Sequence, residues 1–186
     1  MANAEVGDEQ KREDPTVNRL QEMTAELTGK EAALFLPSGT MCNLIAHAIH
    51  CRPGDEIILE ASTHPVHFEG GGPAVHSRAS LRLIDTETGI FTADQVESAI
   101  RPDDPHFPRT RLVCVENTHN LKGGRVWPLQ AVRAVAACAR KHGLALHLDG
   151  ARLMNAVVAS GVSAKDYCEP FDSCWIDLSK GLGCPV

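Results

Sequence analysis

The chain has 186 residues, a formal net charge of -6 and 43% hydrophobic residues, which is enough for one domain with a sizeable core. Lys and Arg are not in excess and only 4% of residues are aromatic, so the composition argues against a nucleic acid partner. The N-terminus lacks the apolar core of a signal peptide, and no segment approaches about 18 uninterrupted apolar residues. We therefore expect a cytoplasmic protein that contacts no membrane.

The cysteines and two of the histidines favour neither a disulfide framework nor a metal site. Seven cysteines are scattered and never spaced as CxxC, which fits reduced thiols packed as small buried hydrophobes. His47 and His50 stand three residues apart with no carboxylate partner, so we interpret them as exposed helix residues. No metal site is predicted.

The first part of the chain predicts a helix, a short strand and a second helix. Residues 1–14 are charged and lack an apolar period, so we treat them as a segment separate from the domain of residues 15–186. Pro15 favours a helix start, apolar residues follow at helical spacing, and Gly29 favours a stop. An apolar run, "AALFL", predicts a strand, and a Ser-Gly-Thr turn leads from it into the helix "MCNLIAHAIH".

The remainder alternates strands with helices. The predicted strands cover 56–61, 81–85, 111–117, 144–149 and 171–179, and the predicted helices cover 93–100, 129–143 and 151–161. Thr92 and Gln95 form a capping box at the first of these helices. Near-continuous apolar strands separated by helices predict an α/β fold of three layers, with helices on both faces of a parallel or mixed sheet.

Polar residues that directly follow strands are the candidates for function, because ligands of such sheets gather where the strands end. Ser38, Gly39 and Thr40 open a helix, where free backbone N–H groups favour an anion such as a single phosphate. Taken alone, such a turn is more often an ordinary helix cap. No GxGxxG follows a strand and no GxxxxGK[ST] is present, so dinucleotide and P-loop sites lack their motifs.

Asp149 and Lys180 both follow predicted strands and are expected at the same edge of the sheet. Asp149 ends an apolar strand, and a carboxylate there can hold a protonated ring nitrogen, as in sites for pyridoxal phosphate (PLP). Without such a ligand it would be a helix cap. Lys180 follows about one strand-helix-strand crossover later, so both side chains should reach the same edge. Arg152 could hold a substrate carboxylate, or be an exposed arginine of a first helical turn.

Five motifs carry a resemblance to a known family: "EDPTVN", "TGKEAALFLPSGTMCN", "ENTHN" with "GGRVWPL", "LHLDGARLMNA" and "LSKGLGCPV". Together, and in this order, they resemble the low-specificity L-threonine aldolases, PLP-dependent enzymes of the aspartate aminotransferase fold type. The resemblance runs from about residue 4 to residue 186. It implies PLP as cofactor and a lyase that cleaves L-threonine or L-allo-threonine to glycine and acetaldehyde.

The resemblance also implies the roles of individual residues. It implies Lys180 as the lysine bonded to the cofactor, Asp149 as the partner of the ring nitrogen, and Ser38, Gly39 and Thr40 as the phosphate site. It further implies that Arg152 contacts cofactor and substrate carboxylate, that His64 stacks on the cofactor ring, and that His119 faces the β-hydroxyl group of the substrate. Lys180, His119 and His64 would then be the catalytic residues.

Family members are homodimers or homotetramers, which the resemblance implies here as well. We expect the chain to be truncated at both ends, with an incomplete large domain and no small C-terminal domain, and to have little or no aldolase activity. Two alternatives stay open: a non-catalytic fragment or subunit-binding module with a PLP-type fold, and another PLP-dependent lyase or an aminotransferase. The aminotransferase would have no special use for His119.

Overall fold

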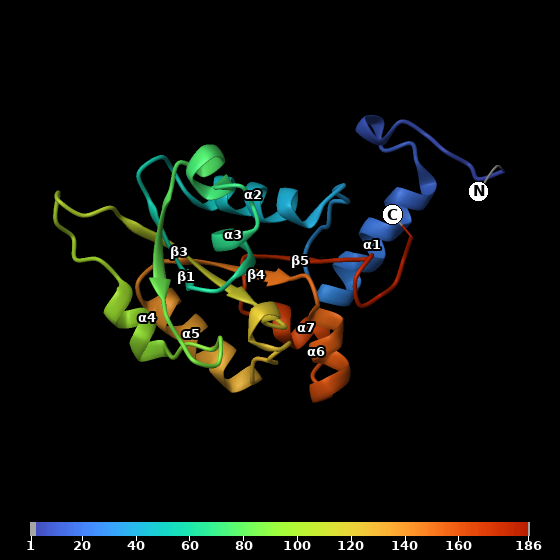
Figure 1. Ribbon diagram of the computed structural model, residues 1–186. Coiled ribbons are helices and arrows are strands. Elements are labelled where there is room, and N and C mark those ends of the chain that lie inside the picture. The colour runs from blue at the N-terminus through green and yellow to red at the C-terminus, as the bar shows by residue number, and fades with distance from the viewer. Residues whose placement is uncertain (1–2, 186) are drawn as a thin grey trace.

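The computed structural model describes residues 3–185, and at its centre lies a five-stranded sheet with helices on both faces (Figure 1). The strands are β1 (Glu56–Glu60), β2 (Ser80–Ile84), β3 (Thr110–Glu116), β4 (Ala145–Gly150) and β5 (Ser173–Ile176). Their order is β2-β1-β3-β4-β5, and every neighbouring pair is parallel. The predicted three-layer α/β architecture is confirmed.

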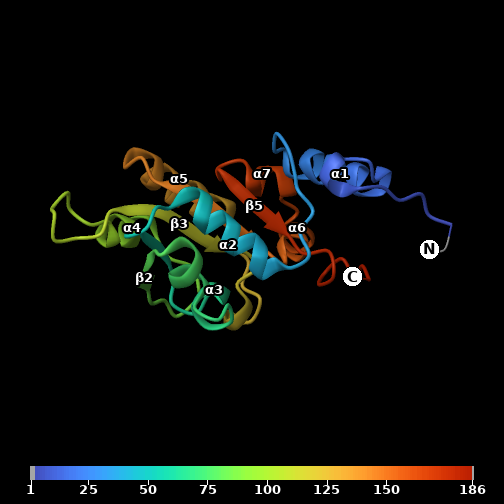
Figure 2. The same cartoon turned by 90° about the horizontal axis from the view of Figure 1, so that it is seen from above.

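Helices on both faces complete the three layers. They are α1 (Pro15–Thr28), α2 (Gly39–His50), α3 (His64–His67), α4 (Ala93–Ala99), α5 (Leu129–Lys141), α6 (Leu153–Ser160) and α7 (Ala164–Cys168), with short helical turns η1 (Glu9–Lys11), η2 (Pro73–Ser77) and η3 (Asn120–Lys122). In Figure 1, α2 and α3 lie on one side of the sheet and α4 to α7 on the other. Seen from above in Figure 2, α2 crosses the sheet and α1 lies beyond the β5 edge. Among the described residues, none of the helices has the length and apolar character needed to cross a bilayer.

The sheet has an apolar core on each face, because successive side chains of a strand point to opposite sides. On β1, Ile57 and Leu59 join the smaller cluster beside α2, whereas Ile58 joins the larger cluster beneath α4 to α7. Trp127 is a fully buried residue of the larger cluster, and its ring meets that of Phe91 edge-on with centroids 4.9 Å apart. Burial on both faces explains why the strands read as continuous apolar runs.

Local sequence signals fix several helix ends. The Asp14 side chain accepts hydrogen bonds from the first-turn amides of α1, and Gly29 ends that helix with a left-handed φ of 66°. At α4, the side chain of Thr92 and that of Gln95 form the predicted reciprocal capping box. Both predicted helix starts are confirmed.

The predicted strand over "AALFL" is wrong. Residues 32–36 form no strand and pair with none among the described residues, and Leu34 is 67% exposed. The amide of Phe35 donates instead to Oε1 of Gln21 on α1, at 2.9 Å. An apolar run becomes a strand only if a neighbour completes its backbone hydrogen bonds, and the run itself does not specify that neighbour.

The prediction that His47 and His50 are exposed is also wrong. His47 has no exposed surface, and its Nε2 lies 3.5 Å from the Cys114 sulfur. His50 is half-buried, with Nε2 2.8 Å from the Ser173 hydroxyl oxygen. Both histidines face the sheet because α2 lies across it. All seven cysteines are free, and four of them are buried as predicted: Cys51, Cys114, Cys138 and Cys168.

Candidate active site

A cleft opens at the carboxyl ends of the strands, between the start of α2 and the loops that follow β1, β3, β4 and β5. Its lining consists of Gly39, Thr40, His64, Glu116, Asn120, Asp149, Ala151, Arg152, Trp175 and Lys180. About 450 Å³ of space free of protein atoms lies within this lining, part of it open to solvent. Six residues singled out in the sequence therefore line one cleft: Gly39, Thr40, His64, Asp149, Arg152 and Lys180.

The start of α2 forms one wall of the cleft. Ser38 is the N-cap of α2, and its hydroxyl accepts a hydrogen bond from the Met41 amide at 3.2 Å, so Ser38 lies behind the lining. At Gly39 a Cβ atom would lie 2.3 Å from the Trp175 ring, so only glycine permits this close approach of helix and indole. The first amides of a helix have no partner within the helix, and they favour an anion at this wall.

Asp149 is a buried carboxylate at the end of β4. Its Oδ2 accepts from the Asn43 amide at 2.8 Å and its Oδ1 from the Ala151 backbone at 3.1 Å. Burial, and then the neighbouring carboxylates of Glu116 and Glu69, raise the pKa of Asp149 to about 7, against the opposing effect of the two hydrogen bonds. The charged neighbours that shift the pKa of Asp149 are thus both acids. A cation placed in the cleft beside Asp149 would stabilise its ionised form.

Asn43 holds this carboxylate in a buried network. Its Nδ2 donates both to Asp149 and, at 2.7 Å, to Glu69, while its Oδ1 accepts from the Trp175 indole at 2.8 Å. His147 also places its Nε2 3.2 Å from that oxygen. All hydrogen-bonding capacity of the Asn43 amide is therefore used. Asn43 was not among the residues singled out from the sequence, because helical spacing does not show which side of α2 meets the sheet.

His64 joins the same network through Glu69. Its Nδ1 lies 2.8 Å from the Glu69 carboxylate, and its backbone amide donates to Glu116 at 2.8 Å. Because an ionised carboxylate only accepts hydrogen bonds, Nδ1 carries the ring proton in the neutral histidine and Nε2 keeps its lone pair. The chain of contacts from Asp149 through Asn43 and Glu69 thus sets the tautomer of His64.

Lys180 lies in the turn after β5. Its ammonium group is 3.1 Å from Oδ2 of Asp177 and 5.5 Å from the centre of the Trp175 ring. Oδ1 of Asp177 accepts the backbone amides of Ser179 and Lys180, at 2.9 and 3.2 Å. These contacts fix the turn that carries the amine, whose side chain is 33% exposed.

His119 lies apart from the cleft lining. It is fully buried, its Nε2 is 3.0 Å from the Glu60 carboxylate, and its Nδ1 has no hydrogen-bond partner among the described residues. The sequence placed His119 after a strand, but the direction of its side chain depends on Glu60, which is 59 residues earlier in the chain. His119 therefore follows β3 at the carboxyl ends of the strands, as expected, but its side chain does not line the cleft with the other candidate residues.

Comparison with known proteins identifies the relatives of this fold and site. The Beta-eliminating lyase family matches residues 1–186. The chain is 48% identical over its whole length to a low-specificity L-threonine aldolase of Escherichia coli, of which it covers 55%, and 46% identical to a probable low-specificity L-threonine aldolase of Arabidopsis thaliana, of which it covers 54%. Its fold superposes on a threonine aldolase structure from Leishmania major with a TM-score of 0.81 and 25% identity, over 88% of this chain and 48% of that one. The chain thus spans about half the length of these relatives.

Proposed function

Because this chain belongs to the Beta-eliminating lyase family, we propose that its cleft is the PLP site of a threonine aldolase-like lyase. The proposed reaction cleaves L-threonine or L-allo-threonine to glycine and acetaldehyde. The observation that carries the proposal is the meeting of Asp149, Lys180 and the start of α2 around one cleft. The whole-length similarity to low-specificity threonine aldolases supports it.

The charges and hydrogen-bond donors of the lining suit PLP. Lys180 would bond covalently to the cofactor, and the first amides of α2 at Gly39 and Thr40 would hold its phosphate, with Ser38 fixing the helix start. Asp149, whose pKa is raised among acids, would gain a cationic partner in the ring nitrogen. Bound PLP supplies an electron sink for breaking the bond between Cα and Cβ of the substrate.

Arg152 and His64 are the proposed substrate-handling groups. Arg152 lines the cleft, and its planar guanidinium group suits a substrate carboxylate. The free lone pair on Nε2 of His64 can accept the proton of the β-hydroxyl group, while Glu69 holds Nδ1 and stabilises the protonated ring. His64 can also stack against the flat cofactor ring.

His119 is proposed to act through Glu60 instead of through direct contact. Oε2 of Glu60 accepts from Nε2 of His119 and also from the amide and the hydroxyl of Ser62, each at 2.6 Å. Ser62 stands two residues before His64, so the pair of His119 and Glu60 fixes the loop that presents His64. We propose a positioning role for His119, in place of the direct contact with the substrate hydroxyl.

We also propose a homodimer or homotetramer in the cytoplasm that forms glycine from threonine, as the likeness to threonine aldolases suggests. The activity is tested by incubating the purified protein, saturated with PLP, with L-threonine and L-allo-threonine and coupling acetaldehyde to NADH oxidation. Slow acetaldehyde formation that disappears in Lys180→Ala but persists in Lys141→Ala is the expected result. Acetaldehyde formed at the same rate by Lys180→Ala and by the parent protein contradicts the proposed activity.

A further inference from the structure

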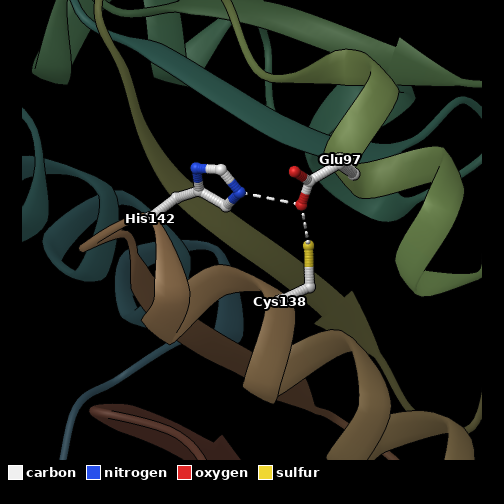
Figure 3. Close-up of side chains that lie close together, drawn as sticks. All are labelled: Glu97, Cys138 and His142. Carbon is white, nitrogen blue, oxygen red and sulfur yellow. Dashed lines mark hydrogen bonds and ion pairs between the residues drawn. The ribbon is translucent and has the colours of Figure 1, made fainter.

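A second cluster of reactive side chains lies between α4 and α5, well away from the cleft. Glu97 of α4 points toward Cys138 of α5 and His142 at the end of α5 (Figure 3). His142 stands three residues before β4 begins, so the cluster lies near the amino ends of the strands, at the opposite edge of the sheet from the cleft. Nothing in the proposed reaction uses these three residues.

The three side chains converge on one point. Oε2 of Glu97 is 3.3 Å from the Cys138 sulfur and 2.7 Å from Nε2 of His142. The sulfur, nitrogen and oxygen atoms all lie within 4.8 Å of one another. Ligands around a tetrahedral Zn²⁺ with bonds of about 2.0–2.3 Å are separated by about 3.3–3.7 Å, so small side-chain rotations suffice to bring all three onto one ion.

We propose that Glu97, Cys138 and His142 form a binding site for Zn²⁺. A thiolate, an imidazole nitrogen and a carboxylate oxygen are the ligand types that this borderline-soft ion prefers, whereas Mg²⁺ and Ca²⁺ prefer oxygen alone. Cys138 and His142 are four residues apart, a spacing that places both ligands on one side of a helix. Three protein ligands leave the fourth position to water.

The charges also suit a divalent cation. A carboxylate from Glu97 and a thiolate from Cys138 together balance the charge of Zn²⁺, and neutral His142 adds none. In the metal-free protein the thiol of Cys138 and the imidazole of His142 share the same carboxylate oxygen. Zn²⁺ binding replaces the thiol hydrogen bond with a Zn–S bond and releases one proton to the buffer.

Lys141 pairs with the Glu97 carboxylate oxygen that the proposed site does not use. Its ammonium group lies 3.2 Å from Oε1 of Glu97, the carboxylate oxygen that faces away from the cluster, and leaves Oε2 for the metal. Glu97 is 45% exposed and His142 is 30% exposed, so an ion can enter from solvent. The site joins α4 to the end of α5, and the expected effect of Zn²⁺ is therefore on stability and not on the chemistry of the cleft.

The test is titration of the purified protein with ZnCl₂ by calorimetry in buffer free of chelator. One equivalent of Zn²⁺ should bind, and Co²⁺ in its place should give a thiolate-to-cobalt charge-transfer band that reports Cys138. Cys138→Ser and His142→Gln should each weaken binding by about 100-fold or more, because even residues behind metal ligands contribute about 10- to 100-fold. His142→Gln alters a partly exposed side chain at a helix end, so it tests the site even if Cys138→Ser folds poorly.

Matched controls exist elsewhere in the chain. His106 is an exposed histidine whose Nδ1 lies 2.9 Å from Asp104, without a cysteine nearby, and Cys184 is an exposed thiol. His106→Ala and Cys184→Ser should leave the affinity for Zn²⁺ within about twofold. Zn²⁺ binding that survives His142→Gln and Cys138→Ser, or a Co²⁺ spectrum without the charge-transfer band, overturns the proposal.

Discussion

The side-chain amide of Asn43 lies 2.8 Å from the Asp149 carboxylate, and through this contact a helix on one face of the sheet orients the acid at the end of β4. Asn43 and Asp149 are 1% and 4% exposed, so water cannot replace either group. Any ligand that bonds to Asp149 therefore depends on a residue that does not itself line the cleft.

Replacing Asn43 should destabilise the fold strongly. Asn43→Ala removes one hydrogen-bond partner from each of two buried carboxylates and from the Trp175 indole, and we expect it to lower the free energy of unfolding by about 3 kcal/mol. Urea denaturation measures the change. Asn18→Ala, which removes one exposed hydrogen bond to the Arg12 carbonyl, should cost about 1 kcal/mol or less. Equal losses in the two variants would mean that the buried network contributes no extra stability.

The raised pKa of Asp149 makes a prediction about pH. Between its usual pKa of 3.8 and its folded value of about 7, the folded state holds a proton that the unfolded state has lost, so stability falls as pH rises through this window. The difference between these two pKa values corresponds to roughly 4 kcal/mol. Buried His47 and His147, whose pKa values are lowered by burial, act in the opposite direction.

The contribution of Asp149 is isolated by comparison with Asp149→Asn, because the histidines are common to both proteins. Without cofactor, the free energy of unfolding of the parent protein minus that of the variant should fall between pH 5 and pH 8, by at most roughly 3 kcal/mol. With PLP present, this free-energy difference should fall less with pH, because the cationic ring nitrogen would favour the ionised form of Asp149. A difference that does not vary with pH contradicts the raised pKa.

Gly39 should not tolerate a larger side chain. In Gly39→Ala the new methyl group would meet the Trp175 ring, and overpacking of this kind costs about 1–3 kcal/mol of stability. The affinity for PLP, measured by its absorbance on titration, should fall together with the stability, because the Trp175 indole and the start of α2 both line the cleft. In a Trp175→Leu background the same substitution should cost less stability, and an equal cost in both backgrounds would exclude the indole as the cause.

Local patterns predicted the elements well because they depend on residues near one another. Pro15 and Gly29 bound α1, and Thr92 starts α4, through contacts within a few residues. The candidate positions also followed from topology, because parallel strands end at a common edge, which is why Asp149 and Lys180 line one cleft.

The features that the sequence did not predict all depend on distant partners. The run "AALFL" does not indicate whether another strand pairs with it. Helical spacing gave the angle between His47 and His50 but not which side of α2 meets the sheet. Likewise, Glu97 meets Cys138 only because α4 packs on α5, and 41 residues separate them in the chain.

The covalent attachment of PLP to Lys180 is the central claim, and one measurement tests it most directly. The protein is incubated with PLP, reduced with borohydride to fix the bond between amine and aldehyde, digested and mapped by mass spectrometry. The account predicts a pyridoxyl group on the peptide that contains Lys180, absent in Lys180→Ala and retained in the control Lys122→Ala, whose lysine is also partly buried. Labelling at another lysine that persists undiminished in Lys180→Ala would contradict the assignment of this cleft.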